Sequence, residues 1–261
     1  MADWALVLGS SSGFGEACAR AFAEDGFNIY GVHLDRKSTA AHVEEVVEGI
    51  KATGRDVEFF NVNAADPAKR EEIVRHIKER LGEGGEQVRV LLHSLAFGTL
   101  KPYIGKEGQA GLAQRELEMT LDVMANSLLY WTRDLVENGL MREGGRIYSM
   151  TSTGDFHAWH SYGAVSAAKC ALEAHTRQLA LELAPHGITV NALRGGVTDT
   201  PALRKIPGNE KLIEIATQRN PHHRLTTPAD LGGAIVALCH PGADWITGNV
   251  INVDGGEEIS A

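Results

Sequence analysis

The stretch WALVLGSSSGFG, residues 4–15, decides the fold. Its first half is a short apolar run of the kind that forms a buried strand, and its second half is the glycine pattern GxxxGxG. Glycines allow a tight turn and close approach of the backbone to a pyrophosphate, and a helix that starts after the turn offers free N–H groups to the phosphates. The stretch therefore predicts a dinucleotide-binding unit, although three glycines alone would also suit an ordinary strand-to-helix turn.

Strand-like and helical stretches alternate along the rest of the chain. Apolar runs lie at 4–9, 27–34, 57–62, 88–94, 145–150, 187–193 and 249–256, and helical patterns lie at 13–26, 39–52, 67–81, 112–139 and 161–185. This alternation predicts parallel strands joined by right-handed crossovers. We expect an α/β fold with a single Rossmann-fold domain over residues 1–261. Its doubly wound parallel sheet has about seven strands, with helices on both faces. The proline-rich stretch 198–228 breaks the rhythm and predicts a small substrate lid.

Composition excludes several classes of function. The chain has 261 residues and a formal net charge of −9, so it lacks the basic footprint of a nucleic-acid binder and would be repelled by anionic membranes. Its first residues lack the basic region of a signal peptide, and no apolar run approaches the length of a membrane span. The widely spaced Cys18, Cys170 and Cys239 form no CxxC pair and suggest no disulfide framework, which indicates a cytoplasmic protein.

The second strand ends in Asp35, Arg36 and Lys37. In dinucleotide-binding sheets an acid at this place binds the adenine ribose of NAD, whereas a nearby arginine accepts the extra phosphate of NADP. Arg36 and Lys37 could hold that phosphate as a charge-assisted pair, and Asp35 could favour NAD instead. We expect NADP(H), with NAD(H) as the alternative. A solvated charged turn would show the same residues.

The segment from Ser152 to Lys169 carries the candidate catalytic group. Tyr162 and Lys169 lie seven residues apart, so on a helix their side chains point to nearly the same side. Ser152 directly follows the fifth strand. A nearby lysine ammonium lowers the pKa of a tyrosine and makes it a better proton donor. The segment predicts that Ser152, Tyr162 and Lys169 act together, although a core tyrosine and a surface lysine would have the same spacing.

Taken together, these motifs resemble the short-chain dehydrogenase/reductase family over the whole chain. The matches, in family order, are GSSSGFG (9–15), Asn61-Val62, HSLAFG (93–98), Asn126, Ser152, Tyr162, Lys169, VNALRGGVTDT (190–200) and VDGG (253–256). The resemblance implies that Lys169 binds the nicotinamide ribose and that Thr200, with the backbone at Val197, holds the carboxamide. The implied cofactor-binding residues are Gly9, Ser11, Ser12, Gly13, Phe14, Gly15, Arg36, Lys37, Asn61, Val62, Ser94, Ala96, Lys169, Gly195, Val197 and Thr200.

The position of the tyrosine narrows the resemblance. Most of the family has its tyrosine four residues before the lysine, where this chain has Val165. The seven-residue spacing and the HSLA stretch resemble the enoyl-acyl-carrier-protein reductases, and Gly195-Gly196 is similar to their NADPH-dependent branch. Ser152 departs from those members of this group that have a second tyrosine there. The resemblance implies reduction of the C=C bond of an enoyl thioester, carried by an acyl carrier protein, in fatty acid synthesis.

The spacing has a chemical rationale. In enoyl reduction the hydride goes to the β-carbon while negative charge develops on the thioester oxygen. Moving a tyrosine one helical turn displaces its hydroxyl by about 5 Å, which could carry it to that oxygen as a hydrogen-bond donor. Two alternatives stay open. One is a carbonyl or alcohol oxidoreductase, such as a 3-oxoacyl-thioester reductase or a hydroxysteroid dehydrogenase, which Ser152 supports. The other is a non-catalytic NADP-binding sensor.

Other features carry weaker expectations. His157 and His160 lack a third ligand at metal spacing, so we expect no metal site. Arg204, Lys205 and Lys211 in the lid could meet an acidic carrier protein, although a solvated helix face explains them equally well. Relatives commonly form tetramers through the long helix and the Tyr–Lys helix, and the resemblance implies a homotetramer.

Overall fold

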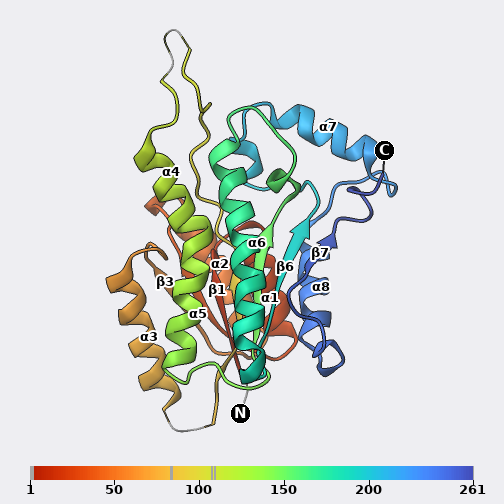
Figure 1. Cartoon of the computed structure of the whole chain (residues 1–261). Coiled ribbons are helices and arrows are strands. Elements are labelled where there is room, and N and C mark those ends of the chain that lie inside the picture. The colour runs from red at the N-terminus through yellow and green to blue at the C-terminus, as the bar shows by residue number, and fades with distance from the viewer. Residues whose placement is uncertain (1–2, 83–84, 107, 109, 261) are drawn as a thin grey trace.

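The computed structural model describes residues 3–82, 85–106, 108 and 110–260 (Figure 1). Seven parallel strands form one sheet in the order β3-β2-β1-β4-β5-β6-β7, which confirms the predicted sheet. The ends of the expected domain, residues 1–2 and 261, lie outside the described residues. The strands are β1 Trp4–Leu8, β2 Asn28–His33, β3 Val57–Asn61, β4 Val88–His93, β5 Arg146–Thr151, β6 Thr189–Gly195 and β7 Val250–Val253.

Helices cover both faces of the sheet, as predicted (Figure 1). One apolar cluster joins the sheet to α1 (Gly13–Glu24), α2 (Ala40–Lys51) and α8 (Pro228–Cys239). A second joins it to α3 (Pro67–Leu81), α5 (Ser127–Glu137) and α6 (Gly163–Leu183). Successive residues of β1 alternate between the two clusters and all are buried, which explains why the strand is apolar throughout.

The long helix expected over 112–139 forms from Gln114 to Glu137, but a π-helical turn divides it. The helix α4 (Gln114–Leu121) ends in a π-helical turn at Asp122–Asn126, and α5 begins after it. A π turn inserts one extra residue into the helical ladder, and the apolar periodicity on either side does not reveal it. Ser127 lies at this join, where its hydroxyl donates to the Val123 carbonyl.

The helix α8 was not expected from the sequence. Thr227 accepts a hydrogen bond from the Asp230 N–H, the Asp230 carboxylate reaches back to the Thr227 N–H, and Pro228 takes the first helical position. Together they form a capping box, a start signal that the sequence does contain. The helix itself is apolar nearly all round because it is packed against α1, and this obscures its periodicity.

The expected lid contains α7 (Asn209–Arg219), which lies beyond the carboxyl ends of the strands (Figure 1). The indole N–H of Trp159 donates to the Pro207 carbonyl at 2.9 Å, and Arg219 Nε donates to the Glu257 carbonyl at 2.6 Å. The lid is therefore joined both to the loop after β5 and to the C-terminal tail. Within the described ranges, no helix is long and apolar enough to cross a membrane.

Candidate functional site

The glycine loop between β1 and α1 packs against the end of β4. A Cβ atom on Gly9, whose φ is +89°, would lie 2.3 Å from the Ser94 carbonyl oxygen, and one on Gly15 would lie 1.9 Å from the Gly9 oxygen. Ser12 precedes α1 without capping it through its side chain, so the first N–H groups of the helix stay available for an anion. The glycine loop thus has no room for side chains at Gly9 and Gly15, and it faces the N-terminus of α1. This arrangement fits a pyrophosphate.

The segment after β6 closes over the glycine loop. The Phe14 ring lies against Gly195, where a Cβ would come within 2.9 Å of Phe14 Cζ. Thr200 Cγ2 would lie 3.5 Å from a Cβ on Gly13. The structure thus brings Gly13, Phe14, Gly195 and Thr200 together, as the sequence predicts for one cofactor site.

The backbone at Val197 is expected to hold the carboxamide with Thr200, and its N–H already has a partner. It donates to the Glu257 carboxylate at 3.1 Å, so Val197 offers its carbonyl but not a free N–H. Glu257 itself is 5% exposed, and burial raises the pKa of its carboxyl. The sequence analysis missed this residue, although an acid directly after the VDGG motif was visible.

The adenosine end of the site centres on Asp35. Hydrogen bonds with Ser11, Thr39 and His33 outweigh the effect of burial and hold the pKa of the Asp35 carboxyl below its usual value. The Asn61 side chain exchanges two hydrogen bonds with the Asp35 backbone. An ionised carboxylate therefore points to the glycine loop, where an adenine ribose would lie.

The basic residues of this turn are more exposed. Arg36 and Lys37 lie at the surface, with no ion pair to another described residue. Val62 is tied to the end of β2 by its N–H, which donates to the His33 carbonyl. Ala96 is exposed at the mouth of the site, two residues beyond Ser94. These residues lie along the carboxyl ends of β2, β3 and β4, as the resemblance implies.

Tyr162 lies directly before α6 rather than within it. Its ring covers Gly154, where a Cβ would meet Tyr162 Cε1 at 2.4 Å. Burial raises the pKa of the Tyr162 phenol, and the nearby Ser152 hydroxyl offsets this only in part. The expected lowering by Lys169 is therefore wrong for the free protein, and the phenol keeps its proton at neutral pH.

Ser152 is partly buried beside Tyr162. Its Oγ is shielded from solvent and makes no geometrically good hydrogen bond to any other described residue, even though it lies close enough to Tyr162 to influence it. A buried hydroxyl without a partner costs free energy unless a ligand or a water completes it. This fits a group that contacts the substrate.

Lys169 is buried and donates a hydrogen bond from Nζ to the Met150 carbonyl at 2.5 Å. Burial lowers the pKa of its ammonium to about 8, and the Glu173 carboxylate one helical turn away opposes that shift. Lys169 is thus charged at neutral pH and loses its proton in mildly alkaline solution. Met150 and Glu173 were not among the predicted residues.

Val165 fills the place where most relatives have the tyrosine. It is 5% exposed and packs in one cluster with Val123 and Met124. Its Cγ2 would lie 2.6 Å from a Cβ on Gly98 in the loop after β4. The ordinary position is therefore closed by apolar packing, and the tyrosine of this chain stands instead directly before the helix, at Tyr162.

The weaker sequence features do not form further sites. His157 Nε2 is 3.8 Å from a Glu258 oxygen, and no cluster of three metal-ligating side chains occurs in the part of the chain that the structure describes. In the lid, Arg204 pairs with both oxygens of Asp199. Its charge is therefore largely neutralised, and Arg219 and Arg224 of the lid are likewise paired, with Glu258 and Asp230. Lys205 and Lys211 are the lysines of this region. The side-chain oxygen of Asn126 accepts a hydrogen bond from His175 Nε2 at 3.2 Å.

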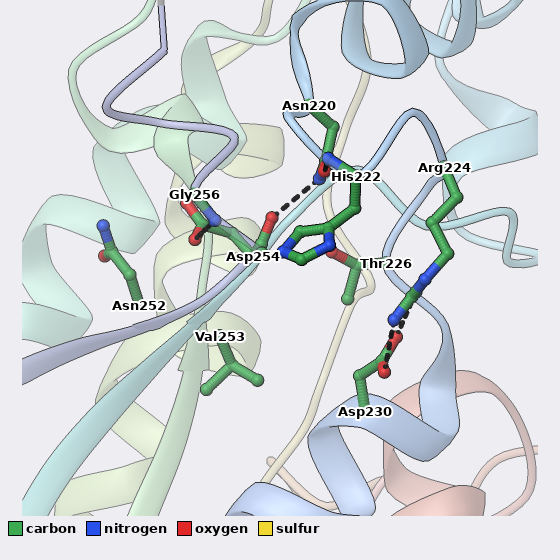
Figure 2. A pocket seen from close by; sticks show the side chains of 10 residues that line it. Asn220, His222, Arg224, Thr226, Asp230, Asn252, Val253, Asp254 and Gly256 are labelled. Carbon is green, nitrogen blue, oxygen red and sulfur yellow. Dashed lines mark hydrogen bonds and ion pairs between the residues drawn. The ribbon is translucent and has the colours of Figure 1, made fainter.

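A separate polar cavity of about 380 Å³ lies between the lid and the end of β7 (Figure 2). Arg224 pairs with both oxygens of Asp230, and Asn220 donates to the Asp254 carbonyl. These groups satisfy one another, and none of the predicted site residues lines the cavity. Its contacts hold the lid to the C-terminal tail.

The chain is similar to known proteins over most of its length. The family described as Enoyl-(Acyl carrier protein) reductase matches residues 9–258. The enoyl-[acyl-carrier-protein] reductase [NADH] of Aquifex aeolicus is 31% identical over 191 residues, which cover 72% of this chain and 69% of that protein. The 2-dehydro-3-deoxy-D-gluconate 5-dehydrogenase of Bacillus subtilis is 28% identical over 252 residues, covering 97% and 93% of the two chains.

The crystal structure of the Aquifex aeolicus enoyl reductase matches with a TM-score of 0.84 at 25% identity, over 99% of this chain and 97% of that one. Similarity thus extends over the whole fold, while the relatives include both reductases of enoyl thioesters and dehydrogenases of other substrates. These matches identify the chain as an oxidoreductase of the short-chain dehydrogenase/reductase family.

Proposed function

We propose that this oxidoreductase reduces the C=C bond of an enoyl thioester. The observation that carries the proposal is the placement of the proton donor. Tyr162 stands seven residues before Lys169, and the ordinary position is filled by the buried Val165. That displacement suits a charge that develops on the thioester oxygen rather than at the carbon that accepts hydride.

Each residue of the site has a definite task in this reaction. A bound reduced nicotinamide would supply the hydride for the β-carbon. Tyr162 remains a neutral phenol, because burial raises its pKa, and its O–H donates a hydrogen bond to the thioester oxygen as negative charge grows there. Lys169 places a positive charge beneath the site, where it binds the ribose hydroxyls and favours the negatively charged oxygen.

The turn after β2 supports a proposal on whether the cofactor is NADH or NADPH. The sequence favours NADP(H) through Arg36 and Lys37. In the structure the ionised Asp35 side chain faces Ser11 of the glycine loop, whereas both basic residues are exposed. A carboxylate there accepts hydrogen bonds from ribose hydroxyls and repels a 2′-phosphate. We propose that Asp35 favours NADH, and that use of NADPH depends on Arg36.

The partner and assembly are also proposals. Lys205 and Lys211 beside the lid offer positive charge to an acidic acyl carrier protein, despite the net charge of −9 on the whole chain. A role in fatty acid synthesis follows if the thioester is on such a carrier. We propose a homotetramer, with α5 and α6 packed against copies of themselves.

Carbonyl reduction is the second candidate, and Ser152 favours it. Its buried hydroxyl lies beside Tyr162 without a good hydrogen bond to any described residue, as a group that binds a substrate carbonyl would. The same hydroxyl can instead assist Tyr162 at a thioester oxygen. The two functions therefore differ in what a Ser152→Ala variant loses.

The test measures dinucleotide oxidation with crotonyl-coenzyme A and acetoacetyl-coenzyme A side by side, each with NADH and NADPH. The proposal expects turnover of the crotonyl thioester at least about tenfold above the acetoacetyl thioester, equivalent to about 1.4 kcal/mol in transition-state free energy. Ser152→Ala should retain most of the crotonyl activity. Turnover of acetoacetyl-coenzyme A alone, lost in Ser152→Ala, would establish the carbonyl reductase instead.

A further inference from the structure

A buried group of charges lies behind the catalytic residues. Arg194 on β6 donates from one guanidinium nitrogen to Asp155 at 2.7 Å and to Glu173 at 3.0 Å. The same Glu173 oxygen accepts a hydrogen bond from the Thr151 hydroxyl at 2.7 Å. The side chains of Asp155, Glu173 and Arg194 are only 8%, 10% and 13% exposed. One guanidinium thus joins two carboxylates out of reach of most solvent.

These charges connect the elements that bear the catalytic residues. Glu173 lies on α6 one turn after Lys169, and Thr151 is the last residue of β5, directly before Ser152. Asp155 belongs to the short 3-10 turn Thr153–Asp155 that follows Ser152. Arg194 is paired in the sheet with Thr151, so the cluster spans β5, β6, α6 and the turn.

The turn is held from several directions. The Arg194 guanidinium stacks on the Phe156 ring at 4.9 Å, and Cys170 Sγ donates to the Asp155 carbonyl. Tyr162 rests on Gly154 in the middle of this turn. Any shift of the turn would therefore move both the Ser152 hydroxyl and the surface that supports the Tyr162 ring.

We propose that Arg194, Asp155 and Glu173 form a positioning cluster that fixes the Ser152 turn against α6 and sets the charge felt by Lys169. Apolar side chains of similar volume would cost less free energy to bury at these three positions than the charged groups do. The cluster is suited to a task that apolar side chains cannot perform, which is to place a negative charge within one helical turn of the Lys169 ammonium.

The surroundings of Lys169 define the direction of the effect. Glu173 raises the pKa of Lys169 against the effect of burial. His93 on β4 also faces Lys169, but burial lowers its pKa to about 3 and keeps it neutral. Tyr162 keeps its proton, and the Met150 carbonyl carries no net charge. Glu173 is thus the charge that acts on Lys169 at neutral pH.

Glu173 is in turn controlled by its neighbours in the cluster. Burial and the second carboxylate at Asp155 raise its pKa, and Arg194 and Thr151 counteract them. Two further titratable groups of α6 lie close in sequence to Glu173. Burial raises the pKa of the Cys170 thiol and lowers the pKa of the His175 imidazole, so it disfavours a charge on either. The net effect leaves the pKa of Glu173 above its usual value, and Arg194 limits that rise. The guanidinium thus favours the ionised Glu173 carboxylate, which in turn favours the protonated form of Lys169.

The test compares Glu173→Gln with the wild-type protein through the side chain of Lys169. In protein labelled with ¹³C-lysine, the Cε resonance of Lys169, assigned from Lys169→Arg, reports its proton loss against pH. We expect Glu173→Gln to move the midpoint downward by about half a pH unit or more, a threefold change in the proton equilibrium. The affinity of Glu173→Gln for NADH, measured by fluorescence titration, should begin to fall at a lower pH than the affinity of the wild-type protein.

The control is Glu182→Gln on the exposed end of the same helix, which should leave the midpoint unchanged. Arg194→Met should speed amide exchange over residues 152–156, while the exchange of β1 stays as in the wild type. An unchanged Lys169 midpoint in a folded Glu173→Gln protein would overturn the charge effect. Unchanged exchange in folded Arg194→Met would overturn the positioning. Neither readout requires turnover, so both stand apart from the proposed reaction.

Discussion

At the residue scale, the proposed reaction uses Tyr162 as a neutral hydrogen-bond donor. Burial raises its pKa, and Lys169 donates its own hydrogen bond to the Met150 carbonyl rather than to the phenol. In the proposed reaction, the tyrosine would contact the substrate oxygen while the lysine supplies a positive charge at the cofactor ribose. The sequence predicts that both residues act in catalysis, but it also predicts that the lysine lowers the pKa of the tyrosine, which the structure does not support.

The first prediction concerns the Tyr162 hydroxyl. Tyr162→Phe removes the donor and keeps the ring on Gly154. We expect kcat for the crotonyl thioester to fall by about 10²–10³-fold, the usual cost of removing one oxyanion donor, while the Kd for NADH changes little. Steady-state kinetics and fluorescence titration measure the two. Full activity in this variant would remove Tyr162 from the mechanism.

The second prediction concerns pH. Lys169 loses its proton near pH 8, so kcat/KM should fall as pH rises through that value. Lys169→Arg retains a positive charge over the whole range, and its lower activity should lack this alkaline decline. A profile that stays flat to pH 10 in the wild-type protein would show that the charge on Lys169 is not required.

The third prediction concerns stability. The folded-state pKa of Lys169 is about 8, below its unfolded value of 10.5, so the unfolded chain holds this proton more tightly between those pH values. The buried charge therefore opposes folding at neutral pH, and its contribution becomes more favourable as pH rises through that window. Lys169→Met should raise the free energy of unfolding at pH 7 by about 1–2 kcal/mol while abolishing activity. Urea unfolding with matched activity assays checks both, and a loss of stability would contradict the argument.

At the element scale, the two adjacent glycines of α8 differ in their surroundings. A Cβ on Gly233 would meet nothing within 4 Å, whereas one on Gly232 would lie 3.2 Å from Ala21 Cβ and 3.3 Å from the Ala17 carbonyl oxygen on α1. The close approach of α8 to α1 therefore requires a glycine at only one of the two positions.

The fourth prediction follows from this difference. Gly233→Ala should raise the free energy of unfolding by about 0.5–1 kcal/mol, because alanine has the higher helix propensity. Gly232→Ala should gain less or lose stability, because the added methyl presses on α1. Thermal or urea unfolding of both variants measures the contrast. Equal gains in the free energy of unfolding for the two variants would show that α1 and α8 can move apart without a loss of stability.

Some structural elements could be predicted from the sequence and others could not. The strand-loop-helix at residues 4–15 was predictable because the apolar strand and the glycines each have one structural use there. The π turn at Asp122–Asn126 was not, because its hydrogen-bond shift leaves the neighbouring apolar pattern intact. The Arg194 cluster was not predictable either, because its three charges come from separate elements and meet only in the folded chain.

For the whole molecule, the order of the strands determines where the site forms. All strands are parallel, but the order in which the chain adds them to the sheet reverses between β1 and β4, and the glycine loop and Ser94 meet at that point. Tyr162, Lys169 and Thr200 come from later segments that end at the same edge. Sequence order therefore predicts which segments meet at this edge, while the contacts of Glu257 and of the Met150 carbonyl required the folded structure.

The fifth prediction concerns assembly. If α5 and α6 pack against copies of themselves, light scattering after size exclusion should give about four times the chain mass of 28.1 kDa. Leu181 on α6 is 71% exposed in the single chain and would be covered in such an assembly. Leu181→Glu should then reduce the mass to that of a dimer or a monomer. A monomeric wild-type protein at micromolar concentration would exclude the tetramer.

The measurement that tests the central claim most directly follows the hydride itself. The protein is given NADH deuterated on the transferred position, together with a mixture of crotonyl and acetoacetyl thioesters, and the products are analysed by mass spectrometry. Reduction of the C=C bond predicts butyryl thioester with deuterium on its β-carbon, and this product should be lost in Tyr162→Phe. Deuterium found only in 3-hydroxybutyryl thioester, with the crotonyl thioester unchanged, would contradict it.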